Sequence, residues 1–319
     1  MAADDFARAL AAGPLVLDGG LSNQLTAAGH DLGDGELWSA RLLADAPEAL
    51  VAAHRAYYAA GAEVVITASY QASFAGFARR GIGRGEAERL LASSVALARQ
   101  AADVAAGDVA AGAVAAGAVA AGDGRRRWVA ASVGPYGAAL ADGSEYRGRY
   151  GLSVAELERF HRPRIEVLAA AGPDVLALET VPDVTEARAL VRAVRGVGVP
   201  AWLCYTVAGG RTRAGEPLAE AFAVAAGAPE VVAVGVNCCA PEEVGAAVRL
   251  AARVTGKPVV AYPNSGERWD PAARDWTGAG AGPAGFAAGW VADGARLVGG
   301  CCRVGPERIA ELSAVLSPR

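Results

Sequence analysis

The sequence predicts a single (β/α)8 barrel domain, on three observations. Short apolar runs rich in β-branched residues recur eight times along the 319-residue chain. These runs are apolar throughout rather than alternating, which is typical of parallel strands covered on both faces. Segments rich in Ala, Leu, Arg and Glu separate them, and several of these end at a glycine, as helices do. No G-x-G-x-x-G fingerprint follows the first run, which disfavours an open dinucleotide-binding sheet.

Each of the eight predicted strands ends in polar or glycine residues. In chain order the runs are residues 15–20, 64–70, 128–134, 175–180, 201–206, 231–239, 258–264 and 295–302. The clearest predicted helices between them are residues 46–61, 86–102 and 241–256. Because barrel active sites lie at the C-terminal ends of the strands, the polar residues there are the functional candidates. They are Asp18, Glu179, Asn237, Cys238, Cys239, Asn264, Cys301 and Cys302.

A low-complexity segment interrupts this alternation after the helix predicted over residues 86–102. Residues 103–122 read DVAAG DVAAG AVAAG AVAAG, and a period of five matches neither a heptad nor a solenoid repeat. The Ala/Gly composition, with Asp103 and Asp108 inside it, gives little drive for membrane insertion. We interpret residues 103–124 as an insertion that lengthens a helix or its following loop. The expected organisation is one barrel domain over residues 1–319 that carries this insertion.

Composition excludes several classes of partner. A formal charge of −4 implies no broad basic face, so no nucleic-acid partner is expected. The single basic run, residues 125–127, is short and is expected in a solvated loop. The N-terminal residues have neither the basic nor the apolar region of a signal peptide. Five cysteines in such a chain therefore suggest reduced thiols and a cytoplasmic location, without a membrane role.

The cysteines form the strongest chemical pattern in the sequence. On a barrel, the ends of the sixth and eighth strands lie close together, so one sulfur from VNCC and two from GGCC can converge. Three sulfur ligands with an open fourth position are typical of catalytic zinc. Gly299 and Gly300 are expected to let the backbone turn tightly enough to aim Cys301 and Cys302 at one ion. The alternative is that these cysteines are small buried apolar residues, which we expect for Cys204 inside its strand.

Several longer motifs carry a family resemblance. They are LDGGLSNQL (17–25), TASYQASFAGF (67–77), ASVGPYGAALADGSEYRGRY (131–150), LALET (176–180), GVNCCAP (235–241), YPNSGERWD (262–270) and GGCCR (299–303). With these motifs the chain resembles the homocysteine S-methyltransferases, a zinc-dependent family of thiol methyltransferases. The resemblance spans roughly residues 13–315 and is greatest to the bacterial branch that uses S-methylmethionine.

The resemblance implies one Zn²⁺ per chain, bound by Cys238, Cys301 and Cys302. Cys239 stands where the family pattern needs no cysteine, and which of the two adjacent sulfurs points inward stays open. Gln24 departs from the family, which often carries Glu at this place, but it does not touch a proposed ligand.

The resemblance also implies where an amino-acid substrate binds. Asp18 and Glu179 would receive the ammonium group of L-homocysteine, and Gly19 and Gly20 would offer N–H groups to its carboxylate. From the residues alone, Asp18 could instead cap the following helix. Glu179 ends an apolar strand, where an unpaired carboxylate is costly, so a cationic partner is expected.

The implied reaction moves a methyl group from a sulfonium donor to the zinc-bound thiolate of L-homocysteine and forms L-methionine. Zinc would remove the proton from a thiol whose pKa is ordinarily about 8.5. S-Methylmethionine is the favoured donor and S-adenosylmethionine the second. No general base is required, which fits a chain with three histidines, His30, His54 and His161, all expected on the surface or in helix packing.

Five further residues are candidates for lining the donor pocket. Tyr70 and Tyr136 lie near strand ends, where they could contact a sulfonium through cation–π interaction or could simply pack. Asn237, Asn264 and Ser265 are expected to shape the pocket.

Other functions are compatible with parts of this pattern. Within the family, the alternatives are a betaine-dependent enzyme or a selenol methyltransferase. A zinc hydrolase is a different class, but such enzymes usually recruit His and carboxylate ligands. A non-enzymatic zinc-binding or thiol redox-sensing protein would use the cysteines alone.

Overall fold

The computed structural model confirms the barrel. It describes residues 2–33, 37–115, 126–270, 275–278 and 280–317. Eight parallel strands form one sheet in the order β1-β12-β9-β8-β5-β4-β3-β2, and each overlaps its predicted run. They are β1 (Leu15–Val16), β2 (Val64–Ile66), β3 (Trp128–Val133), β4 (Val175–Val181), β5 (Ala201–Tyr205), β8 (Val231–Asn237), β9 (Val259–Tyr262) and β12 (Ala295–Val298).

The two edge strands of this sheet meet and nearly close it into a cylinder. Leu17, just past β1, forms an isolated parallel bridge with Val64 of β2. The Asp18 N–H donates to the Val64 carbonyl at 3.0 Å, and the Glu63 N–H donates to the Val16 carbonyl at 2.7 Å. Closure places the C-terminal ends of all eight strands around one opening.

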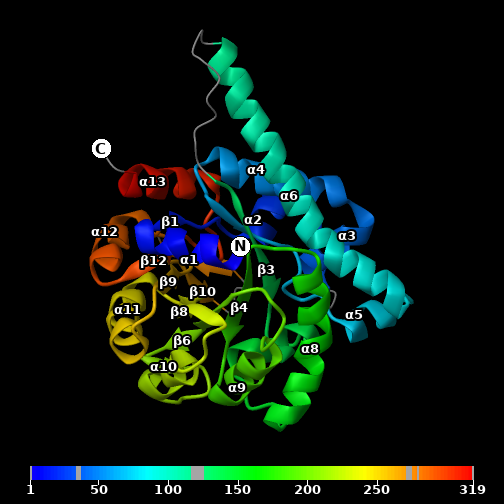
Figure 1. The fold of residues 1–319 in the computed structure, drawn as a ribbon, viewed down its shortest axis with the longest axis vertical. Coiled ribbons are helices and arrows are strands. Elements are labelled where there is room, and N and C mark those ends of the chain that lie inside the picture. Colours follow the sequence, from blue (N-terminus) through cyan, green and yellow to red (C-terminus); the bar gives the residue numbers. More distant parts are fainter. Residues whose placement is uncertain (1, 34–36, 116–125, 271–274, 279, 318–319) are drawn as a thin grey trace.

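Helices surround the strands (Figure 1). They are α2 (Leu21–Ala27), α3 (Leu42–Asp45), α4 (Pro47–Ala59), α5 (Phe74–Arg79), α6 (Arg84–Ala115), α7 (Tyr136–Leu140), α8 (Val154–Ala170), α9 (Val184–Ala193), α10 (Leu218–Ala226), α11 (Pro241–Thr255), α12 (Ala284–Ala292) and α13 (Pro306–Leu316). Two short 3-10 helices, η1 (Trp38–Arg41) and η2 (Ser144–Tyr146), lie in loops. Two hairpins pair β6 (Val207–Ala208) with β7 (Arg211–Thr212), and β10 (Arg268–Asp270) with β11 (Asp275–Thr277).

The predicted helices over residues 46–61 and 241–256 correspond to α4 and α11, and Gly256 ends α11 with a φ of 67°. The helix predicted over residues 86–102 corresponds to α6, which continues into the Ala/Gly repeat, one of the two expected roles of the insertion, and projects beyond the barrel (Figure 1). Residues 116–124 of the proposed insertion lie outside the described residues. Among the described helices, none is long and apolar enough to span a membrane.

An additional helix, α1 (Ala2–Ala12), covers the N-terminal end of the barrel. Its Phe6 and Leu10 are buried with the apolar residues of the barrel interior. The Phe6 ring lies edge-on to Trp128 of β3, with a centroid distance of 5.2 Å, and 6.5 Å from Trp202 of β5. Aromatic burial of this kind closes one end of the barrel, so the polar strand ends form the open one.

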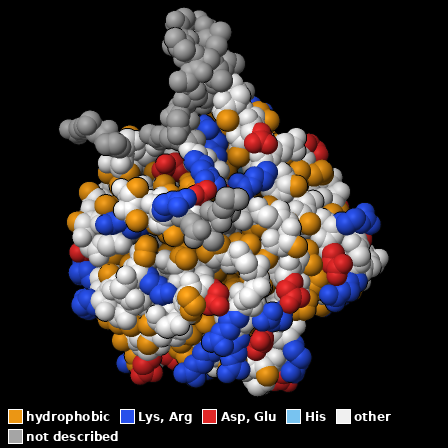
Figure 2. Space-filling model, in the orientation of Figure 1, with side chains coloured by type: hydrophobic (Ala, Val, Ile, Leu, Met, Phe, Trp, Pro, Cys, Tyr) orange, Lys and Arg blue, Asp and Glu red, His pale blue; other side chains and the backbone are white. Residues whose placement is uncertain are grey.

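Charged residues of both signs are interspersed over the described residues of the face shown in Figure 2. Isolated ion pairs of this kind contribute at most about 1 kcal/mol each, so the barrel depends on its apolar interior for stability.

His54 in α4 gives the fold a dependence on pH. Its side chain is fully buried, and neither ring nitrogen has a hydrogen-bond partner among the described residues. Burial lowers the pKa of His54 from 6.5 to about 4. The unfolded chain therefore binds a proton that the folded chain does not, and stability present above about pH 6.5 is lost as the pH falls toward 4.

Between pH 7 and pH 5, we expect the free energy of unfolding of the His54→Leu variant to fall by roughly 2 kcal/mol less than that of the parent chain. Urea unfolding of both proteins at the two pH values measures it. His30→Leu, at a partly exposed position three residues past the end of α2, is the control for removing a histidine. If His54→Leu and the parent chain lose equal stability on acidification, His54 is not the cause.

Candidate metal and substrate site

Three cysteine sulfurs converge at the open end of the barrel. Cys238 follows β8, while Cys301 and Cys302 follow β12, and their Sγ atoms all lie within 4.8 Å of one another. The Cys238 and Cys302 sulfurs are 3.7 Å apart, and those of Cys301 and Cys302 are 4.0 Å apart. Zinc–sulfur bonds of about 2.3 Å in a tetrahedron place sulfurs about 3.8 Å apart. The two distances to the Cys302 sulfur thus match the spacing around a tetrahedral metal ion, and the third distance is at most 4.8 Å.

A left-handed backbone conformation at Cys238 sets the directions of the two adjacent cysteines after β8. Cys238 has a φ of 53°, and its N–H donates to the Tyr262 carbonyl at 3.1 Å. Its carbonyl accepts from the Thr206 hydroxyl at 3.1 Å. This turn aims Cys238 into the cluster, whereas Cys239 is buried in the apolar layer between barrel and helices. Cys238 is therefore the sulfur of this pair that joins Cys301 and Cys302.

The glycines before the cysteine pair are required by close packing. A Cβ on Gly299 would lie 2.6 Å from the Leu17 Cβ and 2.8 Å from the Asp18 carbonyl oxygen. A Cβ on Gly300 would lie 2.5 Å from the Val304 side chain. The tight turn expected from the sequence is thus a close approach of this loop to β1, which only glycine permits.

Asn264 and Ser265 contact the cysteine loop directly. The Asn264 Oδ1 accepts from the Cys302 N–H at 3.2 Å, and the Ser265 N–H donates to the Cys302 carbonyl at 3.0 Å. The Ser265 hydroxyl donates to Glu267, which forms a two-point ion pair with Arg303 at 2.9 and 3.0 Å. These contacts hold the loop on both sides of the Cys302 sulfur.

The three thiols influence one another's ionisation. Hydrogen bonds from the Cys301 and Cys302 thiols lower the pKa of Cys238 well below its usual value. The same contact with Cys238 raises the pKa of Cys301 and of Cys302 well above theirs. One proton leaves readily, and the second and third leave only if a cation offsets the accumulating negative charge. The donor set is thus suited to a soft divalent metal.

Asp18 is fully buried at the end of β1. Its Oδ2 accepts from the Ile66 N–H at 2.7 Å and its Oδ1 from the Tyr262 hydroxyl at 2.9 Å. Burial raises the pKa of this carboxyl well above its usual value. Asp18 does not cap α2, because the N-cap residue is Gly20, which has no side chain to do so. Its carboxylate instead joins β1 to β2 and β9 beneath the cysteine loop.

Gly19 and Gly20 bring the first strand end against the cysteine loop. A Cβ on Gly19 would lie 2.6 Å from the Tyr57 ring, and one on Gly20 would lie 2.7 Å from the Cys301 carbonyl oxygen. The Gly20 N–H donates to the Val304 carbonyl at 3.0 Å. This packing places the backbone of both glycines beside Cys301.

Glu179 is the second buried carboxylate at this end, with 6% of its surface exposed. It accepts from the Ser132 hydroxyl. Burial raises its pKa to about 7, and the neighbouring Cys238 acts in the same direction. Thr180 follows with a φ of 58°, and Asn237 holds it through bonds of 2.7 Å to its N–H and 2.8 Å to its hydroxyl. Asn237 therefore links the Glu179 strand end to the Cys238 strand end.

The two tyrosine candidates have different surroundings. Tyr70 packs against Gly134, where a Cβ would lie 2.7 Å from its ring. Burial raises the pKa of Tyr70, and the nearby Cys238 raises it further. The Tyr136 ring packs edge-on against Phe160 with a centroid distance of 5.0 Å, and none of its described contacts is with a cysteine. The structure brings Tyr70 to the cluster and places Tyr136 in an aromatic layer with α8.

Sequence reasoning missed Tyr146, in η2. Its hydroxyl lies 3.3 Å from the Cys238 sulfur, while 39% of the residue is exposed. The Arg213 guanidinium lies 5.7 Å from its ring centroid. Tyr146 belongs to the motif of residues 131–150, but it lies 13 residues beyond β3, too far for a search confined to strand ends.

Comparison with known proteins now decides the family. A family model described as homocysteine S-methyltransferase matches residues 15–316. The chain is 44% identical over 305 residues to the homocysteine S-methyltransferase of Escherichia coli, covering 94% of each chain. It is 41% identical over 304 residues to homocysteine S-methyltransferase YbgG of Bacillus subtilis, covering 94% of this chain and 93% of that one. The chain belongs to the homocysteine S-methyltransferase family.

A solved structure of a family member shows the same fold. The metallated form of the homocysteine methyltransferase MmuM from Escherichia coli matches with a TM-score of 0.80 at 42% identity, over 95% of this chain and 96% of that one. The match extends over the whole barrel, so the cysteine cluster lies in the part of the fold that the two proteins share.

A buried charged network lies behind the candidate site. Arg164 of α8 donates to the carbonyls of Gly134 and, at 3.3 Å, Ala72, in the loops after β3 and β2. It also contacts the His161 ring at 2.9 Å, and His161 contacts Glu186 at 2.8 Å. His161 is therefore part of the packing behind the site, as the sequence suggested, and the network supports the loop that follows Tyr70.

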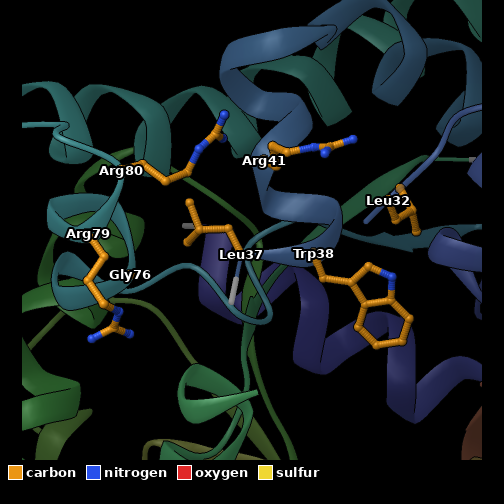
Figure 3. A pocket seen from close by; sticks show the side chains of 7 residues that line it. All are labelled: Leu32, Leu37, Trp38, Arg41, Gly76, Arg79 and Arg80. Atoms are coloured by element: carbon orange, nitrogen blue, oxygen red, sulfur yellow. The ribbon is translucent and has the colours of Figure 1, made fainter. Parts of the chain in front are cut away.

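A separate cavity of about 490 Å³ opens beside η1 and α5 (Figure 3). It is lined by Leu32, Leu37, Trp38, Arg41, Gly76, Arg79 and Arg80, none of them a predicted site residue. Arg41 and Arg80 share the Asp45 carboxylate, at 3.5 and 3.2 Å, and the arginine side chains point in different directions. This cavity offers no ligand set for a metal, so the chemistry is assigned to the cysteine end.

Because close packing fixes the cysteine loop, Gly299→Ala should cost at least about 2 kcal/mol of stability and reduce the bound metal per chain. Thermal unfolding and metal analysis of the purified protein measure both. Gly285→Ala in α12 is the matched control, since nothing lies within 4 Å of its added Cβ. The control should gain up to about 1 kcal/mol. Full metal content and unchanged stability in Gly299→Ala would contradict the packing argument.

Proposed function

We propose that this chain transfers a methyl group from a sulfonium donor to L-homocysteine and forms L-methionine, using zinc held by Cys238, Cys301 and Cys302. The observation that carries the proposal is the convergence of the three sulfurs within 4.8 Å. Family membership supports homocysteine as the acceptor. The existence of a metallated form of the Escherichia coli relative supports a metal at this place.

The donor set supports zinc in particular. Thiolates favour zinc over the hard cations that oxygen ligands bind, and three protein ligands leave a fourth position for substrate. When bound, zinc supplies the positive charge that lowers the pKa of a coordinating thiol and keeps it in its nucleophilic form. The three ligand cysteines must stay reduced, which supports a cytoplasmic location.

The buried carboxylates are proposed to orient homocysteine. Glu179, oriented by Ser132, and Asp18 would face the substrate ammonium. An ammonium beside Glu179 favours its ionised form and offsets the cost of burial. Of the two glycines proposed to meet the substrate carboxylate, Gly20 already donates its N–H to the Val304 carbonyl, so the N–H of Gly19 is the proposed donor. The substrate is thereby held at its amino-acid end while its thiol reaches the cysteine cluster.

The transfer itself conserves charge and atoms without a protein base. The homocysteine sulfur loses its proton to solvent and attacks the methyl carbon in line, while the donor S–CH₃ bond breaks and its electron pair stays on the donor sulfur. A sulfonium and a thiolate become two neutral thioethers, which a partly dehydrated site favours. With S-methylmethionine, both products are methionine. Tyr70 is the proposed aromatic contact for the donor, and Asn237, Asn264 and Ser265 shape the site.

We expect Cys302→Ser to lower zinc from one ion per chain towards none and to lower homocysteine methylation at least about a hundredfold. Metal analysis and a methylation assay of the same preparation measure this. Cys239→Ala is the matched control, since its sulfur is buried away from the cluster and zinc should be kept. Cys302→Ser with full zinc and full activity would disprove the assignment, and zinc binding without methylation in the parent chain would favour a non-enzymatic role.

The donor is tested by competition. With homocysteine as acceptor, S-methylmethionine should give the highest kcat/KM, followed by S-adenosylmethionine, and betaine should give the lowest. A neutral or zwitterionic donor used as well as S-methylmethionine would contradict a sulfonium site. Selenohomocysteine supplied in place of homocysteine tests the selenol alternative in the same assay.

A further inference from the structure

Glu145, in η2, carries a buried carboxylate oxygen without a partner. The residue is 8% exposed, and its Oε2 has no hydrogen-bond partner among the described residues. Nor does any ion pair within the described chain include it, whereas the neighbouring Asp142 pairs with Arg147 at 3.8 Å. Burying an unpaired carboxylate is costly unless a ligand supplies the missing positive charge.

The position of Glu145 is fixed against the site. A Cβ on Gly137 of α7 would overlap the Glu145 backbone N–H and lie 2.6 Å from the Ser144 carbonyl carbon, so η2 lies directly on α7. The next residue, Tyr146, reaches the Cys238 sulfur at 3.3 Å. Burial raises the pKa of the Glu145 carboxyl, and the nearby Cys238 raises it further. The free oxygen is therefore within electrostatic reach of the cysteine cluster.

Two aromatic residues, Tyr70 and Tyr146, lie near Glu145. Tyr70 is close enough to Cys238, Glu145 and Glu179 for each to raise its pKa. The partly exposed ring of Tyr146 already has a guanidinium, that of Arg213, at 5.7 Å. Aromatic faces of this kind attract cations, and the attraction grows as water is excluded. A carboxylate and two aromatic side chains thus lie near Cys238.

We propose that Glu145 is the counter-charge that selects a positively charged methyl donor, with the rings of Tyr70 and Tyr146 as its cation-binding walls. The inference rests on the proposed methyl transfer and adds the residue that recognises the donor. Homocysteine carries no net charge, whereas S-methylmethionine carries one net positive charge. Of the two buried carboxylates proposed to bind the substrate ammonium, Asp18 accepts hydrogen bonds at both oxygens and Glu179 accepts one from Ser132. Glu145, whose Oε2 has no partner among the described residues, is the carboxylate assigned to the extra positive charge of the donor.

This assignment also accounts for release of the product. Methyl transfer removes the positive charge from the donor sulfur, so the attraction of Glu145 for that sulfur disappears with the reaction. The methionine that remains is held only through its ammonium and carboxylate groups, which S-methylmethionine also has. Glu145 therefore favours the charged substrate over its own product.

The test is Glu145→Gln, with binding measured by isothermal titration calorimetry. S-Methylmethionine and methionine share their ammonium and carboxylate and differ in the methyl group and sulfur charge. We expect the substitution to lower the affinity for S-methylmethionine at least about tenfold and the affinity for methionine less than about threefold. Homocysteine affinity and zinc per chain should not change. Asp142→Asn is the matched control, since it removes an exposed charge from the same loop and keeps the oxygen that accepts from Ser144.

Stability separates a binding role from a structural one. Because Glu145→Gln removes an unpaired buried carboxylate, its Tm should equal or exceed that of the parent chain. A lower Tm would overturn the inference. So would an equal loss of affinity for S-methylmethionine and methionine, or a loss of affinity for homocysteine. If the parent chain methylates homocysteine and Glu145→Gln binds S-methylmethionine unchanged, only this inference fails. If the parent chain binds S-methylmethionine in a Glu145-dependent way without transferring its methyl group, only the proposed function fails.

Discussion

The structure depends on bringing sulfurs from two distant parts of the chain to one point. Cys238 and Cys301 are 63 positions apart, and the strands that carry them, β8 and β12, flank β9 in the sheet. The chain segment at the end of β9 connects them, because the Tyr262 carbonyl accepts from the Cys238 N–H and the Pro263 carbonyl from the Cys301 N–H, at 3.1 and 2.6 Å. Backbone hydrogen bonds to the end of β9 thus fix the positions of both cysteines relative to each other.

This convergence requires unfavourable local structure at the open end. Cys238 and Thr180 both adopt left-handed backbone angles without being glycine, which is tolerated where surrounding bonds hold them. Asn237 supplies those bonds at Thr180, and its amide is buried in doing so. The closed end, by contrast, buries Phe6 against Trp128 and Trp202. The residues proposed for chemistry lie at the other end of the barrel, a separation typical of this fold.

The sequence was sufficient for the features that local patterns determine. Eight apolar runs gave eight strands, since strands buried on both faces leave little choice of residue. The sequence was insufficient for the features that depend on tertiary contacts. Helix α1 is held by Phe6 against Trp128, a contact with no sequence signal, and the choice between Cys238 and Cys239 depends on one backbone angle. Tyr146 lies far along a loop, and its approach to Cys238 follows from how η2 packs on α7.

Charge explains why these features occur together. Asp18, Glu145 and Glu179 are all buried at the open end, and burial raises the pKa of each. Three thiols beside them add further negative charge whenever they ionise. Such a site is unfavourable by itself and becomes favourable when cations enter it, so a divalent metal, a substrate ammonium and a sulfonium each offset part of the same cost. A donor that loses its charge on reacting then loses its hold on the site, and the electrostatics that recruit the substrate also release the product.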